Sequence, residues 1–139
     1  MDQNAKLLQS IYENAAMGKA SLSRLIKKCE DANFRQTMAD QFAEYHEIGD
    51  EAEKLLKAVH LAPSSPPKSP LKAHICLNLQ IDKTSTHMSE MLMHGSLLGI
   101  IDMARALREC ANAEETTKAL AQKVLSTEEN NLKRLLAFL

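Results

Sequence analysis

The stretch Ala-Pro-Ser-Ser-Pro-Pro-Lys-Ser-Pro at residues 62–70 contains all four prolines of the 139-residue chain. Proline has no backbone N–H to donate, and it disfavours helical geometry in the residue before it. A helix therefore cannot continue through this stretch. The residues on both sides are rich in Ala, Leu, Lys, Glu, Met and Gln, which lose little side-chain freedom in a helix. The sequence thus predicts two helical halves joined by a linker at residues 62–70.

The half before the linker is predicted to form two helices. One extends from about Asp2 to Cys29, because apolar or small residues recur there at steps of three and four. The next follows almost at once, with Asp31 or Asn33 as its N-cap, so the two helices should be antiparallel neighbours. The predicted seams are Leu8, Ile11, Ala15, Gly18, Leu22, Leu25 and Cys29 in the first, and Met38, Phe42, Tyr45, Gly49, Ala52, Leu56 and Val59 in the second.

The half after the linker contains a longer helical pattern, over residues 71–110. A straight helix of that length would span about 60 Å, against about 40 Å for the others, so the polar run at residues 82–86 is predicted to bend it or to start a new helix. The last helix is predicted to begin with a capping box at residues 112–115 and to continue to the C-terminus. Its seam is Ala121, Leu125, Glu128, Leu132, Leu135 and Leu139.

These patterns predict an all-α fold, an antiparallel four-helix bundle that forms one domain over residues 1–139. The direction of the third helix stays open. An extended stretch of about 26 Å and a helical one of about 18 Å could carry residues 63–82 along the whole bundle, so that the second and third helices are parallel, as in ferritins. An up-down-up-down bundle with an overlong third helix is equally compatible.

Charge and composition exclude some classes of protein. The net charge is −1 and the longest cationic cluster is Lys27-Lys28, which gives no electrostatic basis for binding nucleic acid or an anionic membrane. The sequence has neither a membrane-span pattern nor a signal-peptide pattern, so we expect a cytoplasmic protein. The cysteines, Cys29, Cys76 and Cys110, are odd in number and widely spaced, which favours free thiols.

All four glycines lie inside helical patterns, where each costs about 0.5–1 kcal/mol relative to Ala. One interpretation is close approach of helix backbones. The other is a waist left open for a ligand or for bulky side chains. The glycines are Gly18, Gly49, Gly95 and Gly99, and the bulky candidates are Tyr12, Tyr45 and Met91.

A metal site is the first chemical function to consider in a four-helix bundle. Di-iron bundles present Glu-x-x-His on two helices, but no Glu in this chain has His three residues later. His87, Glu90 and His94 nevertheless share one helical face, and imidazole with carboxylate suits Fe, Zn or Mn. With Glu128 they form the candidate metal site. No cofactor is otherwise predicted, and the alternative is that these histidines are ordinary surface groups.

Two carboxylates occur in apolar surroundings, where they must be paired, protonated or metal-bound. Asp102 has Arg105 three residues later as an available ion-pair partner. Glu128 lies on the seam of the last helix, and its candidate partners are Asn131, Lys118 or a tyrosine hydroxyl.

Four segments resemble a group of small uncharacterised proteins of clostridial Firmicutes, and the resemblance extends over nearly the whole chain. They are Tyr-Glu-Asn-Ala-Ala-Met-Gly at 12–18, Thr-Ser-Thr-His-Met-Ser-Glu-Met at 84–91, Gly-Ser-Leu-Leu-Gly-Ile-Ile-Asp-Met at 95–103, and Glu-Glu-Asn-Asn-Leu-Lys-Arg-Leu at 128–135. The resemblance implies a ferritin-like bundle, related to rubrerythrin and bacterioferritin and often dimeric. Active members of that superfamily hold a di-iron site for oxidation or iron storage. This chain lacks the Glu-x-x-His pairs, so the resemblance implies the fold and not the activity.

Three functions remain in view. The leading hypothesis is a non-enzymatic structural or interaction module that forms a homodimer, with Leu7, Leu97 and Ile101 off the seams as an apolar strip. The second is a metal-binding bundle, which requires the four candidate ligands to converge. The third is a carrier of a small apolar ligand at the glycine waist, and no motif for nucleophilic catalysis or phosphate binding is present.

Overall fold

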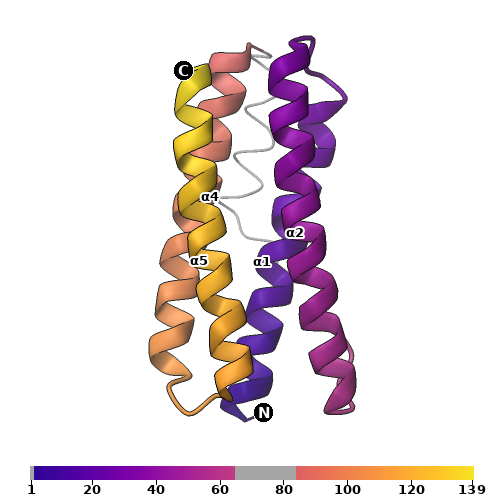
Figure 1. The fold of residues 1–139 in the computed structure, drawn as a ribbon, viewed down its shortest axis with the longest axis vertical. Helices are drawn as coiled ribbons and strands as arrows, with labels where there is room; N and C mark the ends of the chain where they lie inside the picture. The colour runs from indigo at the N-terminus through magenta and orange to yellow at the C-terminus, as the bar shows by residue number, and fades with distance from the viewer. Residues whose placement is uncertain (1, 65–83) are drawn as a thin grey trace.

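The computed structural model describes residues 2–64 and 84–139 as four long helices and a final short turn of 3₁₀-helix. The helices are α1 (Gln3–Ile26), α2 (Ala32–Ala58), α4 (Ser85–Glu109) and α5 (Glu115–Leu135), and the turn is η1 (Leu136–Phe138). They pack side by side as an elongated bundle (Figure 1). The predicted four-helix bundle is confirmed. The predicted helical residues 71–83, most of the linker and Cys76 lie outside the described residues.

Three helices begin at capping residues that the sequence supplies locally. Asp2 accepts from the Ala5 N–H at 2.7 Å to cap α1, and Asp31 accepts from the Asn33 and Phe34 N–H groups at 2.9 and 3.1 Å to cap α2. The predicted N-cap at Asp31 is confirmed. Thr84 caps α4, so a helix does begin within the polar run at residues 82–86.

The turn before α5 is bonded to another helix. The predicted capping box at Asn112 is wrong, because α5 begins at Glu115 and no side chain of its own caps it. The N–H groups of Asn112 and Glu114 instead donate to the side-chain oxygens of Gln3 and Asn4, at 2.7 and 3.1 Å. Asn4 thus satisfies the N–H of the N-cap residue Glu114, and Gln3 satisfies an N–H in the turn before it.

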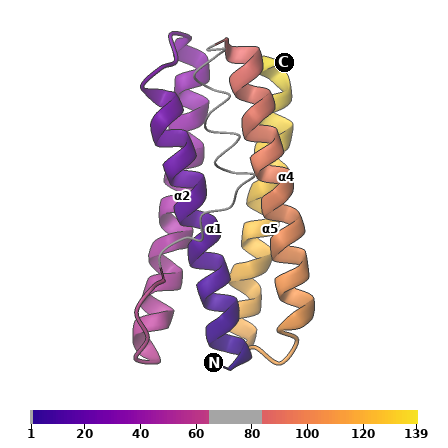
Figure 2. The same cartoon turned by 180° about the vertical axis from the view of Figure 1, so that it is seen from behind.

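Helix directions follow from contacts at the end of the bundle where the chain starts. There Gln9 donates to the Ala62 carbonyl just after α2, at 2.9 Å, while Gln3 accepts from Asn112 just after α4. Helices α2 and α4 therefore end at the same end of the bundle and are parallel, at diagonal corners (Figures 1 and 2). Each laterally adjacent pair is antiparallel: α1 with α2, α2 with α5, α5 with α4 and α4 with α1. The up-down-up-down alternative is thus excluded.

The predicted seams form most of the core, with instructive exceptions. Leu7 is fully buried, so its predicted place on an exposed strip is wrong: α1 has neighbours on two sides and buries a face wider than one seam. Asp102 is exposed, and its predicted apolar setting is also wrong, because the buried positions of α4 include Gly99 and Met103 and a residue just before Met103 points away. Leu97 and Ile101 are exposed, as predicted.

Two further expectations concern the described residues. Cys29 and Cys110 are buried free thiols, as the odd cysteine count indicated. Within residues 2–64 and 84–139, no helix combines the length and the apolar character needed to cross a membrane.

Candidate functional site

A cavity of about 50 Å³ lies at mid-height in the bundle, bordered by all four helices. Its apolar walls are Met17, Leu22, Leu25, Met91 and Leu92. Four polar side chains, Gln41, Tyr45, Ser96 and Glu128, reach the same space, and all four are at most 5% exposed. We call this space the waist cavity. Apolar walls with a few convergent polar groups are typical of small-molecule sites.

Three of the glycines lie around this cavity, and each does something different. A Cβ added at Gly18 would come within 2.7 Å of the Tyr45 ring, so the absence of a side chain lets that ring lie flat on α1. A Cβ at Gly99 would overlap the Glu128 carboxylate. A Cβ at Gly95 would have no atom of the described residues within 4 Å, so among those residues this glycine borders open space.

The fourth glycine lies away from the cavity. A Cβ at Gly49 would make an ordinary contact of 3.5 Å with the Ala15 Cβ. Close approach of two helices, space for a bulky side chain and open space therefore all occur, each at a different glycine. The sequence presented them as alternatives.

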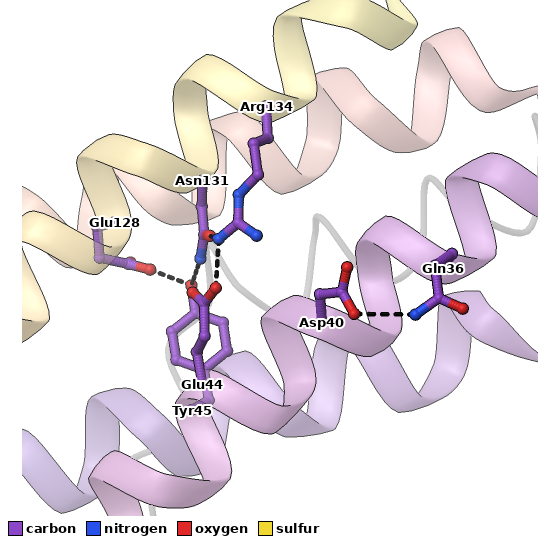
Figure 3. Close-up of polar contacts among 7 residues, drawn as sticks. All are labelled: Gln36, Asp40, Glu44, Tyr45, Glu128, Asn131 and Arg134. Atoms are coloured by element: carbon purple, nitrogen blue, oxygen red, sulfur yellow. Dashed lines mark hydrogen bonds and ion pairs between the residues drawn. The ribbon is translucent and has the colours of Figure 1, made fainter.

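A chain of hydrogen bonds connects the cavity to the bundle surface (Figure 3). The Tyr45 hydroxyl donates to Glu128 Oε1, and Asn131 Nδ2 donates to the Tyr45 oxygen at 3.3 Å. Arg134, which is partly exposed, donates to Asn131 Oδ1 at 2.6 Å and to Glu44 Oε1 at 2.5 Å. The tyrosine and asparagine partners proposed for Glu128 from the sequence are therefore both in its cluster.

The proton on Tyr45 is held firmly. Burial, reinforced by the negative charge of Glu128, raises the pKa of Tyr45 well above its ordinary value, although hydrogen bonds from Asn131 and Ser96 act in the other direction. At neutral pH the Tyr45 hydroxyl is therefore a hydrogen-bond donor, and Glu128 Oε1 is its acceptor.

Among the described residues of the cavity, Gln41 is the one whose side chain has a buried hydrogen-bond donor without an acceptor. Its side chain is 2% exposed, and its Nε2 donor has no hydrogen-bond partner within the described ranges. Buried donors in native proteins are almost always paired, and each unpaired one calls for an explanation. Nε2 is therefore free to donate to an acceptor that enters the cavity.

The four predicted metal ligands are at two different kinds of position. Glu90 Oε1 and His94 Nε2 lie 3.8 Å apart on the exposed side of α4, and His87 lies in its first turn, whereas Glu128 is buried beside Tyr45. Within residues 2–64 and 84–139, no three His, Cys, Asp or Glu side chains are grouped closely enough to hold a metal ion. A role for His87, Glu90, His94 and Glu128 in binding Fe, Zn or Mn stays a prediction.

Sequence reasoning identified Glu128, Tyr45 and the glycines but did not identify Gln41 or Ser96. A signal was present for both. Gln41 lies between Met38 and Tyr45 at steps of three and four, so it shares their buried face, whereas Phe42 was assigned to that seam. Ser96 lies four residues after Leu92 and three before Gly99 on the buried face of α4. In both cases the overlooked signal was a polar residue three or four positions away from buried residues of the same helix.

The fold and the site together define an all-α four-helix bundle with a largely apolar cavity that a few polar side chains enter. Comparison with protein-family models, with curated proteins and with solved structures gives no significant match. The resemblance to ferritin-like clostridial proteins therefore stays a prediction, and the site has to be interpreted from its own chemistry.

Proposed function

We propose that this bundle binds a small molecule in the waist cavity. The observation that supports this most strongly is Gln41, whose buried Nε2 borders the cavity and finds no acceptor among the described residues. Leaving a buried donor unpaired costs about 1–3 kcal/mol. A ligand that supplied an acceptor would recover this free energy on binding.

Gly95 supports the same proposal. Replacing it by Ala would remove a helix penalty of about 0.5–1 kcal/mol, and no atom of residues 2–64 or 84–139 stands in the way of the added methyl group. Packing against these residues therefore does not require glycine here. A residue that forgoes available stability beside an open, partly polar space is typical of a functional site.

Cavity size limits the ligand. At about 50 Å³, the waist cavity is smaller than the engineered cavity of about 150 Å³ that holds benzene. It suits a ligand of a few non-hydrogen atoms, or one end of a longer molecule. Met17, Ser21 and Gly95 border it and are partly exposed, so the rest of a longer ligand could extend toward solvent.

The relation to ferritin-like proteins is a separate part of the proposal. The parallel direction of α2 and α4 supports it, because a single long crossover is the ferritin arrangement. It implies no iron chemistry here, since the Glu-x-x-His pairs are missing from the sequence.

The proposal is tested by titrating the ¹⁵N-labelled protein with 1-propanol, which has a short apolar chain and one hydroxyl. We expect saturable shifts of backbone amide signals at the waist cavity, and weaker binding by Gly95→Ala. Gly49→Ala is the matched control, because it adds the same methyl to a helix away from the cavity. Shifts that are absent from the waist, or equal weakening by both variants, would contradict the proposal.

A second candidate function is an interaction module that works as a homodimer. It is favoured by Leu97 and Ile101, which are 49% and 43% exposed and lie one turn apart on α4. Sedimentation equilibrium of the wild type and of a Leu97→Glu, Ile101→Glu variant tests it. A dimer that the double variant dissociates would support this function, and a wild-type monomer at high concentration would exclude it.

A further inference from the structure

The waist cavity has an apolar half and a polar half, and the register of the helices separates them. A Cβ added at Gly18 of α1 would lie within 2.7 Å of the Tyr45 ring of α2, so these two residues are at the same height. The two helices are antiparallel, so four residues forward from Gly18 and four residues back from Tyr45 lead the same way along the bundle, by about 6 Å. Leu22 and Gln41 are therefore at one height, about one turn away from the Tyr45 ring.

Helix α4 follows the same division. Gly99 lies opposite Glu128, since a Cβ added at Gly99 would overlap the carboxylate. Met91 and Leu92 come about two turns before Gly99. Because α4 is parallel to α2 (Figure 1), they lie toward the end where α2 begins, as Gln41 does. The apolar half is thus the part of the cavity bordered by Leu22, Met91, Leu92 and Gln41, and the polar half is the part bordered by Glu128.

The protein itself satisfies the polar half. The Tyr45 hydroxyl donates to Glu128 Oε1, and its oxygen receives hydrogen bonds from Asn131 and Ser96. These contacts take the one donor and two acceptor positions of a hydroxyl. Glu128 has a further interaction besides the one with Tyr45. Among the described residues, Gln41 is therefore the buried polar side chain of the cavity that still needs a partner.

The Gln41 donor lies in apolar surroundings. Its Nε2 is buried and has no hydrogen-bond partner within residues 2–64 and 84–139. Leu22 and Leu92 carry no polar side-chain atom, and the Met91 sulfur is only a weak acceptor. A ligand that enters this half of the cavity therefore meets the Gln41 donor and apolar side chains.

Given that the waist cavity binds a small molecule, we propose that its ligand is a neutral, largely apolar molecule with a carbonyl or ether oxygen that accepts a hydrogen bond from Gln41 Nε2. A carboxylate would also accept from Gln41, but it would bring a second negative charge into a cavity that Glu128 borders. An ammonium group has only donors, so it would leave Nε2 without an acceptor.

Four probes of the same shape and size separate these cases: acetone, isobutene, acetate and isopropylammonium. Isobutene is acetone with its oxygen replaced by a CH₂ group, so it lacks the acceptor. Titrations of the ¹⁵N-labelled protein at neutral pH give the Kd of each probe. We expect acetone to bind at the waist. Acetate and isopropylammonium should bind about tenfold more weakly or worse, because one buries a charge beside Glu128 and the other leaves Nε2 unpaired.

Gln41→Met isolates the contribution of the ligand oxygen, because it keeps the length of the side chain and removes the donor. The ratio of the isobutene Kd to the acetone Kd should fall about tenfold from the wild type to this variant, since acetone loses a hydrogen bond that isobutene never makes. Comparing ratios cancels the different hydration of the two probes. Gln36→Met, on the exposed side of the same helix, is the matched control and should leave the ratio unchanged.

A second measurement needs no variant, so it tests the assignment even if Gln41→Met does not fold. The side-chain N–H signals of Gln41 in the wild type should move downfield when acetone binds, because a new hydrogen bond deshields the proton. They should not do so when isobutene binds.

The outcomes distinguish the two proposals. If none of the four probes and not 1-propanol binds at the waist, the proposed function itself fails. If probes bind there but Gln41→Met leaves the ratio unchanged, or if acetate or isopropylammonium binds most tightly, the cavity binds ligands and the assignment of a neutral acceptor is overturned. A ratio that falls in Gln41→Met and not in Gln36→Met, with the downfield shift for acetone alone, supports both.

Discussion

The end of the bundle where α2 begins and α5 ends differs sharply from the waist. At the end, Phe34, Met38 and Leu135 are fully buried, and the Phe34 and Phe138 rings meet edge to face at 4.5 Å and 81°. At the waist, Gly18, Gly95 and Gly99 border a cavity, and the Gln41 Nε2 donor has no partner among the described residues. Packing at the end therefore stabilises the fold, whereas the residues at the waist are less favourable for stability than they could be. Natural proteins keep such unfavourable residues mainly at functional sites.

The largest effect is expected at the end. Phe34→Ala removes a fully buried ring from the first turn of α2 and leaves a space that its neighbours cannot fully close. We expect the free energy of unfolding to fall by about 3–5 kcal/mol, measured by urea denaturation. A loss below about 1 kcal/mol would mean that this end is not the stabilising region.

At the waist, Gly18→Ala should have the next largest effect. The new methyl group would lie within 2.7 Å of the Tyr45 ring, which its hydroxyl contacts hold in place. We expect a loss of about 1–3 kcal/mol by urea denaturation. Gly49→Ala is the control: its methyl makes only ordinary contacts, so it should be neutral or stabilising by up to about 1 kcal/mol.

Stability should also depend on the Tyr45 proton. Because the folded state raises the pKa of Tyr45 above its unfolded value, the folded form keeps a proton that the unfolded form loses. The contribution is therefore complete below about pH 10 and is lost as pH rises toward the folded pKa, by at most about 1.4 kcal/mol per pH unit.

Tyr45→Phe provides the comparison, because it keeps the ring over Gly18 and removes the titrating group. The free energy of unfolding of the wild type should fall more steeply with pH above about pH 10 than that of the variant. Parallel curves for the two proteins would show that Tyr45 is not held in its protonated form.

The smallest expected effect has the opposite sign. Gln41→Met removes, at nearly constant volume, a buried donor that has no partner within residues 2–64 and 84–139, so it should raise the free energy of unfolding by about 1 kcal/mol. Gln36→Met on the same helix is the control, since Gln36 is exposed and bonded to Asp40 at 2.9 Å, and should change stability by less than about 0.5 kcal/mol. Destabilisation by Gln41→Met would show that the amide is paired in solution.

Much of the fold was predictable because it depends on local chemistry. Proline at residues 62–70 separates the halves, Asp31 caps α2, and the three- and four-residue steps locate most core positions. The hydrogen bonds that hold the turn before α5 were not predictable, since their acceptors are Gln3 and Asn4 in α1. The direction of α4 was also left open, because chain length permits both topologies.

The candidate site was only half predictable. Glu128 was recognisable as a carboxylate on the seam of the last helix. The glycines were recognisable because each destabilises its helix and nothing nearby in the sequence explains it. Gln41 was not recognisable, because a polar residue beside Phe42 looks like the solvent side of the helix until the neighbouring helices are placed. Which glycine borders open space depends on side chains from other helices, so Gly95 and Gly49 look alike in sequence.

The pairing of the helices also has a consequence for the order of assembly. The most extensive contacts join α1 to α2 and α4 to α5, each pair linked by a few residues, so each is a hairpin with low contact order that can form early. The hydrogen bond between Tyr45 and Glu128 links the two hairpins, and residues of both hairpins line the waist cavity. The binding site therefore forms only when the two hairpins pack against each other, and a bound ligand would slow their separation.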